Sequence, residues 1–305
     1  MFDIITFGSA VVDIFVDTDM AEKKGNICYS IGSKVLIKNL KFNIGGGGTN
    51  TAVAFSRLGF KTGYIGKLDN DFGGNKILDL LRKEKVGFLG KIAAHANEFG
   101  GYSIILDSKE NDRTVLTYKG LNDSIKISDL SLKQIQTRWL YLSSLLEDSF
   151  ATQKTLANGL YKNGTKIAFN PSEYAIKVLD LMPILKITEI LILNKEEAEL
   201  LCRKNRVHEK DLLKGLHSLG PRIVVITNKD KEVLAYDGER KYFLVPHKIK
   251  VKERTGAGDA FASGFVAGQM AGKSIEDSLN LGLQESESVI RHQGAKIGLI
   301  RRRLR

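Results

Sequence analysis

From about residue 138 onward, short apolar runs alternate with amphipathic stretches. WLYLSS is followed by ATQKTLANGLYKNG, and KIAFNPS, EILILNKEEAELLCRK and RIVVITNKD continue the alternation. Apolar bursts of four or five residues followed by helical periodicity are typical of βα units, in which a parallel sheet is buried on both faces. Because the opening IITFGSAVVD follows the same plan, the pattern predicts an α/β fold with a mostly parallel sheet.

The apolar runs end in polar residues, namely Ser143, Asn170, Asn194 and Thr227. In open α/β sheets, ligands bind at the carboxyl ends of the strands. We therefore expect these four side chains to line one cleft.

Two segments have a different pattern. Residues from about 13 to 43 and from about 97 to 118 place Thr, Tyr, Val and Ile between turn residues, which predicts strands and hairpins. These β excursions are expected to form a small sheet that covers the cleft. From residue 259 to about 291 the pattern is helical, with a break near Gly272. With no internal repeat and no low-complexity linker, residues 1–305 are expected to form one domain.

Composition narrows the function only slightly. The net charge is +11, but Lys and Arg are mixed with Glu and Asp along the chain, apart from the terminal run RRRLR. This distribution favours attraction of an anionic small substrate over nucleic-acid binding, which would predict steeply salt-dependent association with DNA or RNA. No apolar run reaches the length of a membrane span. The two cysteines and five scattered histidines do not suggest a disulfide framework or a metal site, so we expect a reduced, cytoplasmic protein.

The stretch TGAGDAF near the C-terminus carries the most specific chemistry. Gly256, Ala257 and Gly258 precede Asp259 at a predicted helix start, where unpaired N–H groups and the positive end of the helix dipole suit a transferring phosphoryl group. Asp259 could accept the proton of the attacking hydroxyl. The alternative is that Asp259 only caps the helix, which does not explain the three small residues before it.

The stretch NIGGGGTN, residues 43–50, lets a ligand approach the backbone closely. A polyhydroxy ligand on this glycine bed, hydrogen-bonded by Asn50, is one interpretation. The other is a flexible turn before a helix that Asn50 caps.

Asn194 and Glu197 lie one helical turn apart after a predicted strand. They could hold the water ligands of Mg²⁺ beside nucleotide phosphates, or they could be a helix cap and a surface Glu. Asp13 follows the first predicted strand and turn at the same cleft edge, and its alternative is an ordinary turn acid.

Together these motifs resemble the ribokinase-like (PfkB) family of carbohydrate and nucleoside kinases, over nearly the whole chain from FGSAVVD to RHQGA. The resemblance implies a three-layer, doubly wound, mostly parallel sheet with a small β-sheet lid. It implies an ATP-dependent kinase that uses Mg²⁺. Asp259 would be the catalytic base and Gly256, Ala257 and Gly258 the anion hole.

The resemblance also assigns binding roles. Asn194, Glu197 and Thr227 would contact the nucleotide, with Glu197 reaching Mg²⁺ through water. The substrate hydroxyls would be held by Asp13, Gly45, Gly46, Asn50 and Arg113. Glu253 stands where the family often has Asp, so K⁺ could bind there. Departures at 228–231 and at 284–285 affect the expected contacts to adenine, and Val11 and Gly47 replace the Asn and Lys of ribokinases proper.

We therefore expect a sugar kinase that transfers the γ-phosphoryl group of ATP to a sugar hydroxyl, and a homodimer formed through the lid. The alternatives are a nucleoside kinase of the same family and a non-catalytic sensor of sugar or nucleotide on a kinase fold. Neither a membrane nor a nucleic acid is expected as a partner.

Overall fold

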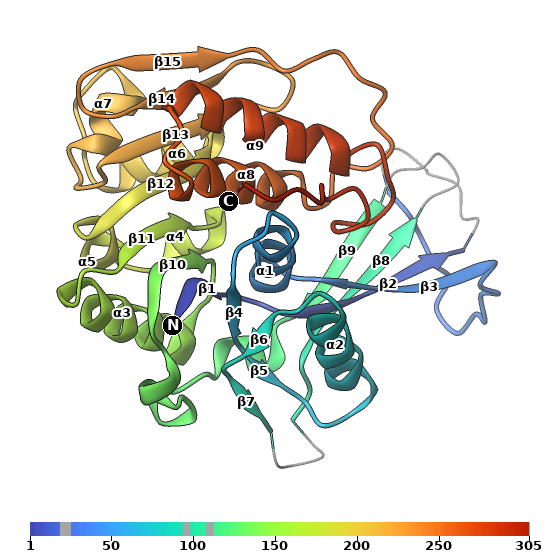
Figure 1. Ribbon diagram of the computed structural model, residues 1–305. Helices are drawn as coiled ribbons and strands as arrows, with labels where there is room; N and C mark the ends of the chain where they lie inside the picture. The colour runs from blue at the N-terminus through green and yellow to red at the C-terminus, as the bar shows by residue number, and fades with distance from the viewer. Residues whose placement is uncertain (19–25, 94–97, 108–112, 305) are drawn as a thin grey trace.

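The computed structural model describes residues 1–18, 26–93, 98–107 and 113–304. Within them a nine-stranded sheet runs in the order β15-β14-β13-β12-β11-β10-β1-β4-β6 (Figure 1). Its strands are β1 (Phe2–Phe7), β4 (Thr62–Ile65), β6 (Gly87–Phe88), β10 (Thr137–Ser143), β11 (Lys166–Asn170), β12 (Thr188–Asn194), β13 (Ile223–Thr227), β14 (Val233–Tyr236) and β15 (Lys241–Leu244). The strands from β6 to β13 pair in parallel, and only the edge pairs β13–β14 and β14–β15 are antiparallel. The mostly parallel sheet predicted from the apolar runs is confirmed.

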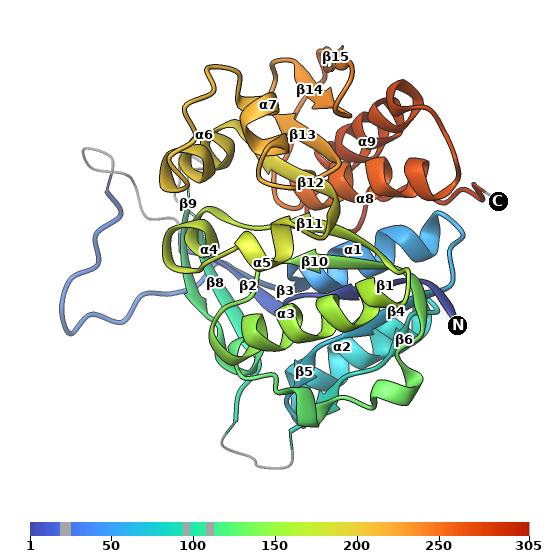
Figure 2. The same cartoon turned by 90° about the vertical axis from the view of Figure 1, so that its left-hand side faces the viewer.

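Helices cover both faces of this sheet (Figure 2). One face carries α3 (Glu147–Lys162), α4 (Glu173–Val178), α5 (Met182–Leu185), α6 (Lys195–Lys204) and α7 (Leu212–His217). The other face carries α1 (Gly47–Arg57), α2 (Phe72–Lys83), α8 (Ala257–Met270) and α9 (Ile275–Val289). Short 3₁₀ turns lie at Gly120–Asp123, Ile127–Asp129 and Leu132–Gln134. The three-layer, doubly wound architecture is confirmed.

Strand β10 shows why the strands read as continuous apolar runs. Leu140 and Leu142 pack into the core beneath α3, whereas Trp139 and Tyr141 pack into the core beneath α8. Since successive side chains of a strand point to opposite faces, a strand buried on both faces has no polar positions to alternate with.

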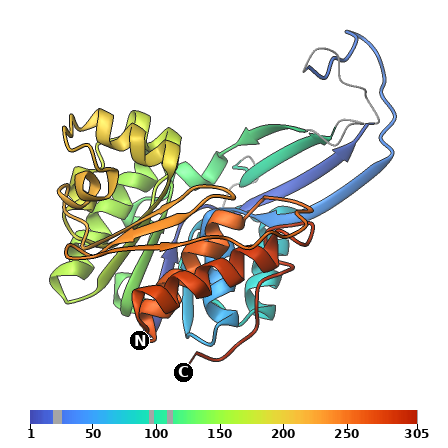
Figure 3. The ribbon, with the colours of Figure 1, turned by 90° about the horizontal axis from the view of Figure 1, so that it is seen from above.

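The small sheet is also present and extends away from the body (Figure 3). It has the order β3-β2-β8-β9 and consists of β2 (Val11–Asp17), β3 (Asn39–Gly45), β8 (Gly101–Asp107) and β9 (Arg113–Tyr118). A separate two-stranded piece pairs β5 (Lys67–Leu68) with β7 (Lys91–Ile92).

The expected β character of residues 13–43 is correct only at the two ends of that segment. Residues 26–38 form turns and irregular chain with one bridge residue, Asn26. Lys38 N–H donates to Asp17 O at 2.8 Å, and β2 ends at Asp17, so the described part of β2 offers residues 26–37 no further pairing. Residues 19–25, 97 and 108–112 of the expected β segments lie outside the described residues.

Two adjacent rows across the small sheet differ in polarity. A row across its four strands, Phe42, Ile14, Ile104 and Leu116, is entirely apolar. The next row along the strands, on the opposite face, is polar throughout and consists of Asn43, Asp13, Ser103 and Thr117. Asp13 in this polar row interacts electrostatically with Lys296 of the main body, so the row is turned toward the body.

The basic C-terminal run packs against the end of α1. Arg302 N–H donates to Arg57 O at 3.0 Å, and Leu304 N–H donates to Leu58 O at 3.2 Å. Two guanidinium groups meet at Glu84: Arg57 at 2.7 Å and Arg301 at 3.0 Å. Burial alone would raise the pKa of Glu84, but these two arginines hold it below its usual value. Among the described residues, no helix is long and apolar enough to cross a membrane.

Replacing Glu84 by Gln should destabilise the fold strongly, because the Glu84 side chain is only 3% exposed and its removal leaves Arg57 without its buried counter-ion. We expect a loss of about 3 kcal/mol in the free energy of unfolding. Asp79→Asn removes a pair with Arg82 in which the Asp79 side chain is 69% exposed, and should cost less than about 1 kcal/mol. Urea denaturation of both variants tests this, and equal losses would contradict it.

Candidate active site

The start of α8 is open to the cleft. Gly256 caps this helix with φ 79°, a left-handed conformation that favours glycine. A Cβ at Gly256 would lie 2.4 Å from the Cβ of Ala295. No side chain in the described part of the chain caps α8. Ala257 N–H donates to Arg254 O at 3.2 Å, so the N–H groups of Gly258 and Asp259 are the ones available to an anion. Asp259 is the third residue of this helix.

The start of α1, by contrast, is closed by the protein itself. Gly46 caps it with φ 92°, and a Cβ there would lie 2.5 Å from Ser9 O. Ser9 accepts the helix N–H groups: Gly47 N–H donates to Ser9 Oγ at 3.2 Å, and Gly48 N–H to Ser9 O at 3.0 Å. Of the two glycine-rich helix starts singled out in the sequence, only that of α8 is therefore suited to bind an exogenous anion through its amides.

Asp259 is joined to α1 by Asn50. The Nδ2 of Asn50 donates to Asp259 Oδ2 at 2.7 Å, and the Oδ1 of Asn50 accepts from the ammonium of Lys296. Asn50 lies inside α1, not at its cap. Burial raises the pKa of Asp259, and the Asn50 hydrogen bond and the Lys296 charge oppose this rise. The other carboxylate oxygen, Oδ1, is directed toward Gly47, where an added Cβ would lie 3.4 Å away.

A cavity of about 220 Å³ joins the start of α8 to the ends of three strands. Its polar lining includes Asn170, Asn194 and Thr227 at the ends of β11, β12 and β13. The full lining is Asn170, Ile192, Leu193, Asn194, Glu197, Thr227, Gly256, Gly258 and Asp259. Three of the four polar strand ends thus share one cavity, because carboxyl ends of parallel strands meet at one edge of a sheet.

Asn194 and Glu197 form a capping box at the start of α6. Glu197 N–H donates to Asn194 Oδ1 at 2.8 Å, and Asn194 N–H donates to Glu197 Oε2 at 2.9 Å. The helix-cap interpretation of Asn194 is confirmed, but Glu197 is half-buried and not a surface residue, and both residues line the cavity. Burial raises the pKa of Glu197. Thr227 completes this edge, where its Oγ1 donates to Leu193 O at 3.4 Å.

The donor set fits a magnesium ion that is held mainly by phosphates and water. No cluster of three or more His, Cys, Asp or Glu among the described residues could form an all-protein metal site. Mg²⁺ commonly keeps several water ligands and takes one or two carboxylates beside substrate phosphates. Glu197, which lines the cavity, can meet such a water ligand.

The other expected binding residues lie around this cavity or at the small sheet. Asp13 packs against Gly45, where a Cβ would lie 2.2 Å from Asp13 Oδ2, so this position requires glycine. Arg113 begins β9, and its side chain lies outside what the structure describes. Glu253 accepts a hydrogen bond from Gly294 N–H at 2.8 Å.

Three neighbouring residues received no specific role from the sequence, although two of them, Asn170 and Ser143, were expected at the cleft as strand ends. Asn170 and Ser143 end predicted strands, and their place at a strand end is the sequence signal for a position at the cleft. The Oγ of Ser143 is buried without a hydrogen-bond partner in the described structure. Lys296 follows directly after the QGA stretch, and a lone lysine in a basic chain offers no signal of burial.

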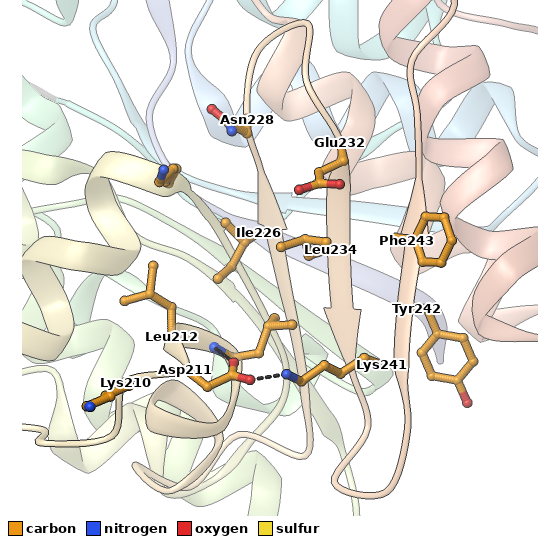
Figure 4. Close-up of a pocket in the computed structure, with 12 residues that line it drawn as sticks. Lys210, Asp211, Leu212, Ile226, Asn228, Glu232, Leu234, Lys241, Tyr242 and Phe243 are labelled. Carbon is orange, nitrogen blue, oxygen red and sulfur yellow. Dashed lines mark hydrogen bonds and ion pairs between the residues drawn. The ribbon is translucent and has the colours of Figure 1, made fainter.

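A larger cavity of about 670 Å³ lies on the α6–α7 face of the sheet, beside β14 and β15 (Figure 4). Apolar side chains such as Leu212, Leu234 and Phe243 line it, and Lys241 and Asp211 close an ion pair with each other at its edge. Since Asp259 and the start of α8 line the smaller cavity and not this one, we assign the chemistry to the cavity at Asp259.

Comparison with known proteins agrees with this site. The sequence matches the pfkB family of carbohydrate kinases over residues 1–301, and the chain belongs to this family. It is an ATP-dependent carbohydrate kinase of that family, which typically uses Mg²⁺. An uncharacterized sugar kinase of Archaeoglobus fulgidus is 31% identical over 256 residues, covering 82% of this chain and 99% of the relative. A cytidine kinase of Thermococcus kodakarensis is 37% identical over 147 residues, 47% of this chain and 52% of the relative.

Solved structures share the fold. Ribokinase from Thermotoga maritima superimposes with a TM-score of 0.82 at 20% identity, covering 97% of this chain and 95% of that chain. A nucleoside kinase of Burkholderia thailandensis in complex with inosine gives a TM-score of 0.75 at 17% identity, covering 97% and 94% of the two chains.

Gly256 and Gly258 should respond differently to alanine. Gly256→Ala places a Cβ against Ala295 in a left-handed conformation, so we expect a loss of about 2 kcal/mol or more in the free energy of unfolding. A Cβ at Gly258 meets no atom within 4 Å. The free energy of unfolding of Gly258→Ala should therefore lie within about 1 kcal/mol of that of the unmodified protein. Urea denaturation compares the two, and a Gly258→Ala loss as large as that of Gly256→Ala would contradict the assignment.

Proposed function

We propose that the protein transfers the γ-phosphoryl group of ATP to a sugar hydroxyl, with Asp259 as the general base. The observation that carries this proposal is that Asp259, the open start of α8 and the polar ends of three strands line one cavity. This arrangement offers amides to the phosphoryl oxygens and a carboxylate to the attacking hydroxyl within the same space.

The chemistry follows from where each group lies. The amides of Gly256, Ala257 and Gly258 at the positive end of α8 stabilise charge that develops on the phosphoryl oxygens. Asp259 Oδ1 orients the acceptor hydroxyl and takes its proton as the bond to phosphorus forms, in line with the departing ADP. Asn194, Glu197 and Thr227 hold the polyphosphate end of the nucleotide. Mg²⁺, when bound there, neutralises part of the phosphate charge.

The polar row of the small sheet supports its role as a lid over a hydroxyl-rich acceptor. Asp13 and its row neighbours Asn43 and Ser103 present hydrogen-bonding groups on the side toward the body. Asp13, Gly45, Gly46 and Asn50 would surround the sugar, and Arg113 at the start of β9 would reach it or its phosphate. Closure of the lid excludes water and so prevents wasteful hydrolysis of ATP.

A monovalent cation such as K⁺ would bind beside Glu253, whose carboxylate lies at the Gly294 backbone close to the start of α8. Both cysteines are free, which supports a cytoplasmic location. The spread of basic residues supports a small anionic substrate, here ATP, over nucleic acid.

A nucleoside acceptor is the second candidate. The similarity to a cytidine kinase over 47% of this chain favours it, and so does Val11, an apolar residue on the same face of β2 as Asp13. A panel of sugars and nucleosides, assayed for ATP-dependent phosphorylation, decides between the two. If no acceptor stimulates ATP consumption while the folded protein binds ATP, the kinase proposal fails and a sensor role is favoured.

Asp259→Asn should lower kcat by about 10²- to 10⁴-fold and leave ATP binding nearly unchanged, because the amide cannot accept the proton. Asp277→Asn is the matched control, since Asp277 is also the third residue of its helix, α9, but is exposed. Steady-state kinetics with the accepted substrate and calorimetric ATP titration give the two quantities. A fully active Asp259→Asn variant would rule out Asp259 as the base.

We also propose that two copies associate through the outer faces of their lids. Phe42, Ile104 and Leu116 are 49%, 39% and 53% exposed and lie in one row on the face opposite Asp13, although Phe42 also contacts Phe72 at the start of α2. An exposed apolar row of this kind marks an interaction surface, and a second copy presents the same row in a two-fold arrangement.

Leu116→Asp should therefore halve the mass measured by light scattering at micromolar concentration, because it places a carboxylate in the apolar row, at its β9 end. Val115→Asp, at the neighbouring position on the opposite face of β9, should leave the mass unchanged. A dimer that survives Leu116→Asp, or an unmodified protein that is monomeric, would contradict this association.

A further inference from the structure

Lys296 is a buried lysine beside the proposed active site. It is 8% exposed and follows α9 in the C-terminal segment. Its ammonium donates to Ile44 O at 2.6 Å, at the end of β3, and to Asn50 Oδ1 in α1. Burying an ammonium is costly unless hydrogen bonds and opposite charges compensate it, so a lysine at this place calls for an explanation.

The charges around Lys296 come from four elements. Asp13 on β2 and Asp259 on α8 act to keep the ammonium charged, and so does Glu84 at the end of α2. Arg57 on α1 opposes the charge. Burial is the largest influence and lowers the pKa of Lys296 to about 7 despite these carboxylates.

The Lys296 ammonium decides which way Asn50 points. An ammonium can only donate hydrogen bonds, so the Asn50 atom that faces it must be the carbonyl oxygen. The amide nitrogen is then turned toward Asp259, where it donates to Oδ2 at 2.7 Å. Without the ammonium, Asn50 Oδ1 loses this donor and the side chain is held in its orientation only by the bond from Nδ2 to Asp259.

We propose that Lys296 is a positioning residue for the catalytic base: through Asn50 it holds one oxygen of Asp259 and leaves the other for the acceptor hydroxyl. Its charge also balances Asp13 and Asp259 across the site. This inference rests on the proposed function, in which Asp259 accepts the proton. The relay runs from Lys296 Nζ to Asn50 Oδ1, and from Asn50 Nδ2 to Asp259 Oδ2.

A purely structural lysine would do less. It would join Ile44 to α1 and stabilise the fold, and its loss would lower stability without changing the ionisation of Asp259. The two roles therefore differ in the pH dependence of catalysis. Removing the ammonium should raise the pKa of Asp259, since burial is then opposed by Asn50 alone.

The sign of the pH effect follows from the charge required of each group. Asp259 acts as a base only when ionised, so kcat/KM falls as pH drops through its pKa, and Lys296→Met should move this acid limb to higher pH. In the unmodified protein, Lys296 loses its proton as pH rises through its own pKa, which gives an alkaline limb. Lys296→Met and Lys296→Arg should both lack that alkaline limb, and Lys296→Arg should keep the original acid limb because its guanidinium stays charged.

The experiment measures kcat and KM from pH 5 to 9 for Lys296→Met, Lys296→Arg, Asn50→Leu and the double variant Lys296→Met/Asn50→Leu. Lys273→Met, an exposed lysine at the break between α8 and α9, is the matched control. We expect Lys296→Met to lower kcat on the order of 10²-fold with little change in the KM for ATP. The double variant should be no slower than the slower single variant, because both remove one relay.

An unchanged acid limb in Lys296→Met, or rate losses that multiply in the double variant, would overturn the proposal. If urea titrations show that Lys296→Met is unfolded, Lys296→Gln replaces it. An acid limb of Lys296→Gln at the same pH as in the unmodified protein would then overturn the proposal. If the unmodified protein phosphorylates no acceptor, the proposed function fails separately. The carboxyl pKa of Asp259, followed by carbon-13 NMR, then tests the relay alone: a rise in the variant supports it and no change overturns it.

Discussion

A carboxylate that must remain ionised at the bottom of a cleft is the constraint on which much of this structure depends. Burial disfavours the charged form of Asp259, and the protein offsets this with one amide hydrogen bond and one buried ammonium. These compensating groups come from α1 and from the segment after α9, whereas Asp259 belongs to α8. The site is therefore assembled only when three distant parts of the chain have packed together.

The same packing explains why the C-terminal run is ordered against α1. Arg57 donates to Lys296 O at 2.6 Å and also binds Glu84, which in turn binds Arg301. The backbone that carries Lys296 is thus held by an ion-pair network outside the cleft. The Arg57 guanidinium therefore links the stability of the C-terminal run to the position of the Lys296 ammonium.

The two glycine-rich helix starts show how similar sequences acquire different uses. Both have a left-handed glycine at the cap and N–H groups that need partners. At α1 the partner is Ser9 of the same chain, so this glycine bed serves close packing between β1, β3 and the helix. At α8 the partner is left to a ligand, and an acid two residues into the helix adds proton transfer to anion binding.

The sequence by itself determined the parallel sheet, the helices that cover it, the small β-sheet and the grouping of polar strand ends. These features follow from periodicity and from the rule that parallel strands end at one edge, both of which are local or topological. It did not determine that residues 26–38 lack strand structure, because their pairing depends on where β2 ends. Nor did it reveal Lys296, whose role depends on burial and on the charges of Asp13 and Asp259, which lie 283 and 37 residues away in sequence. Burial, charge compensation and the direction of the Asn50 amide are properties of packed groups, and only the tertiary structure decided them.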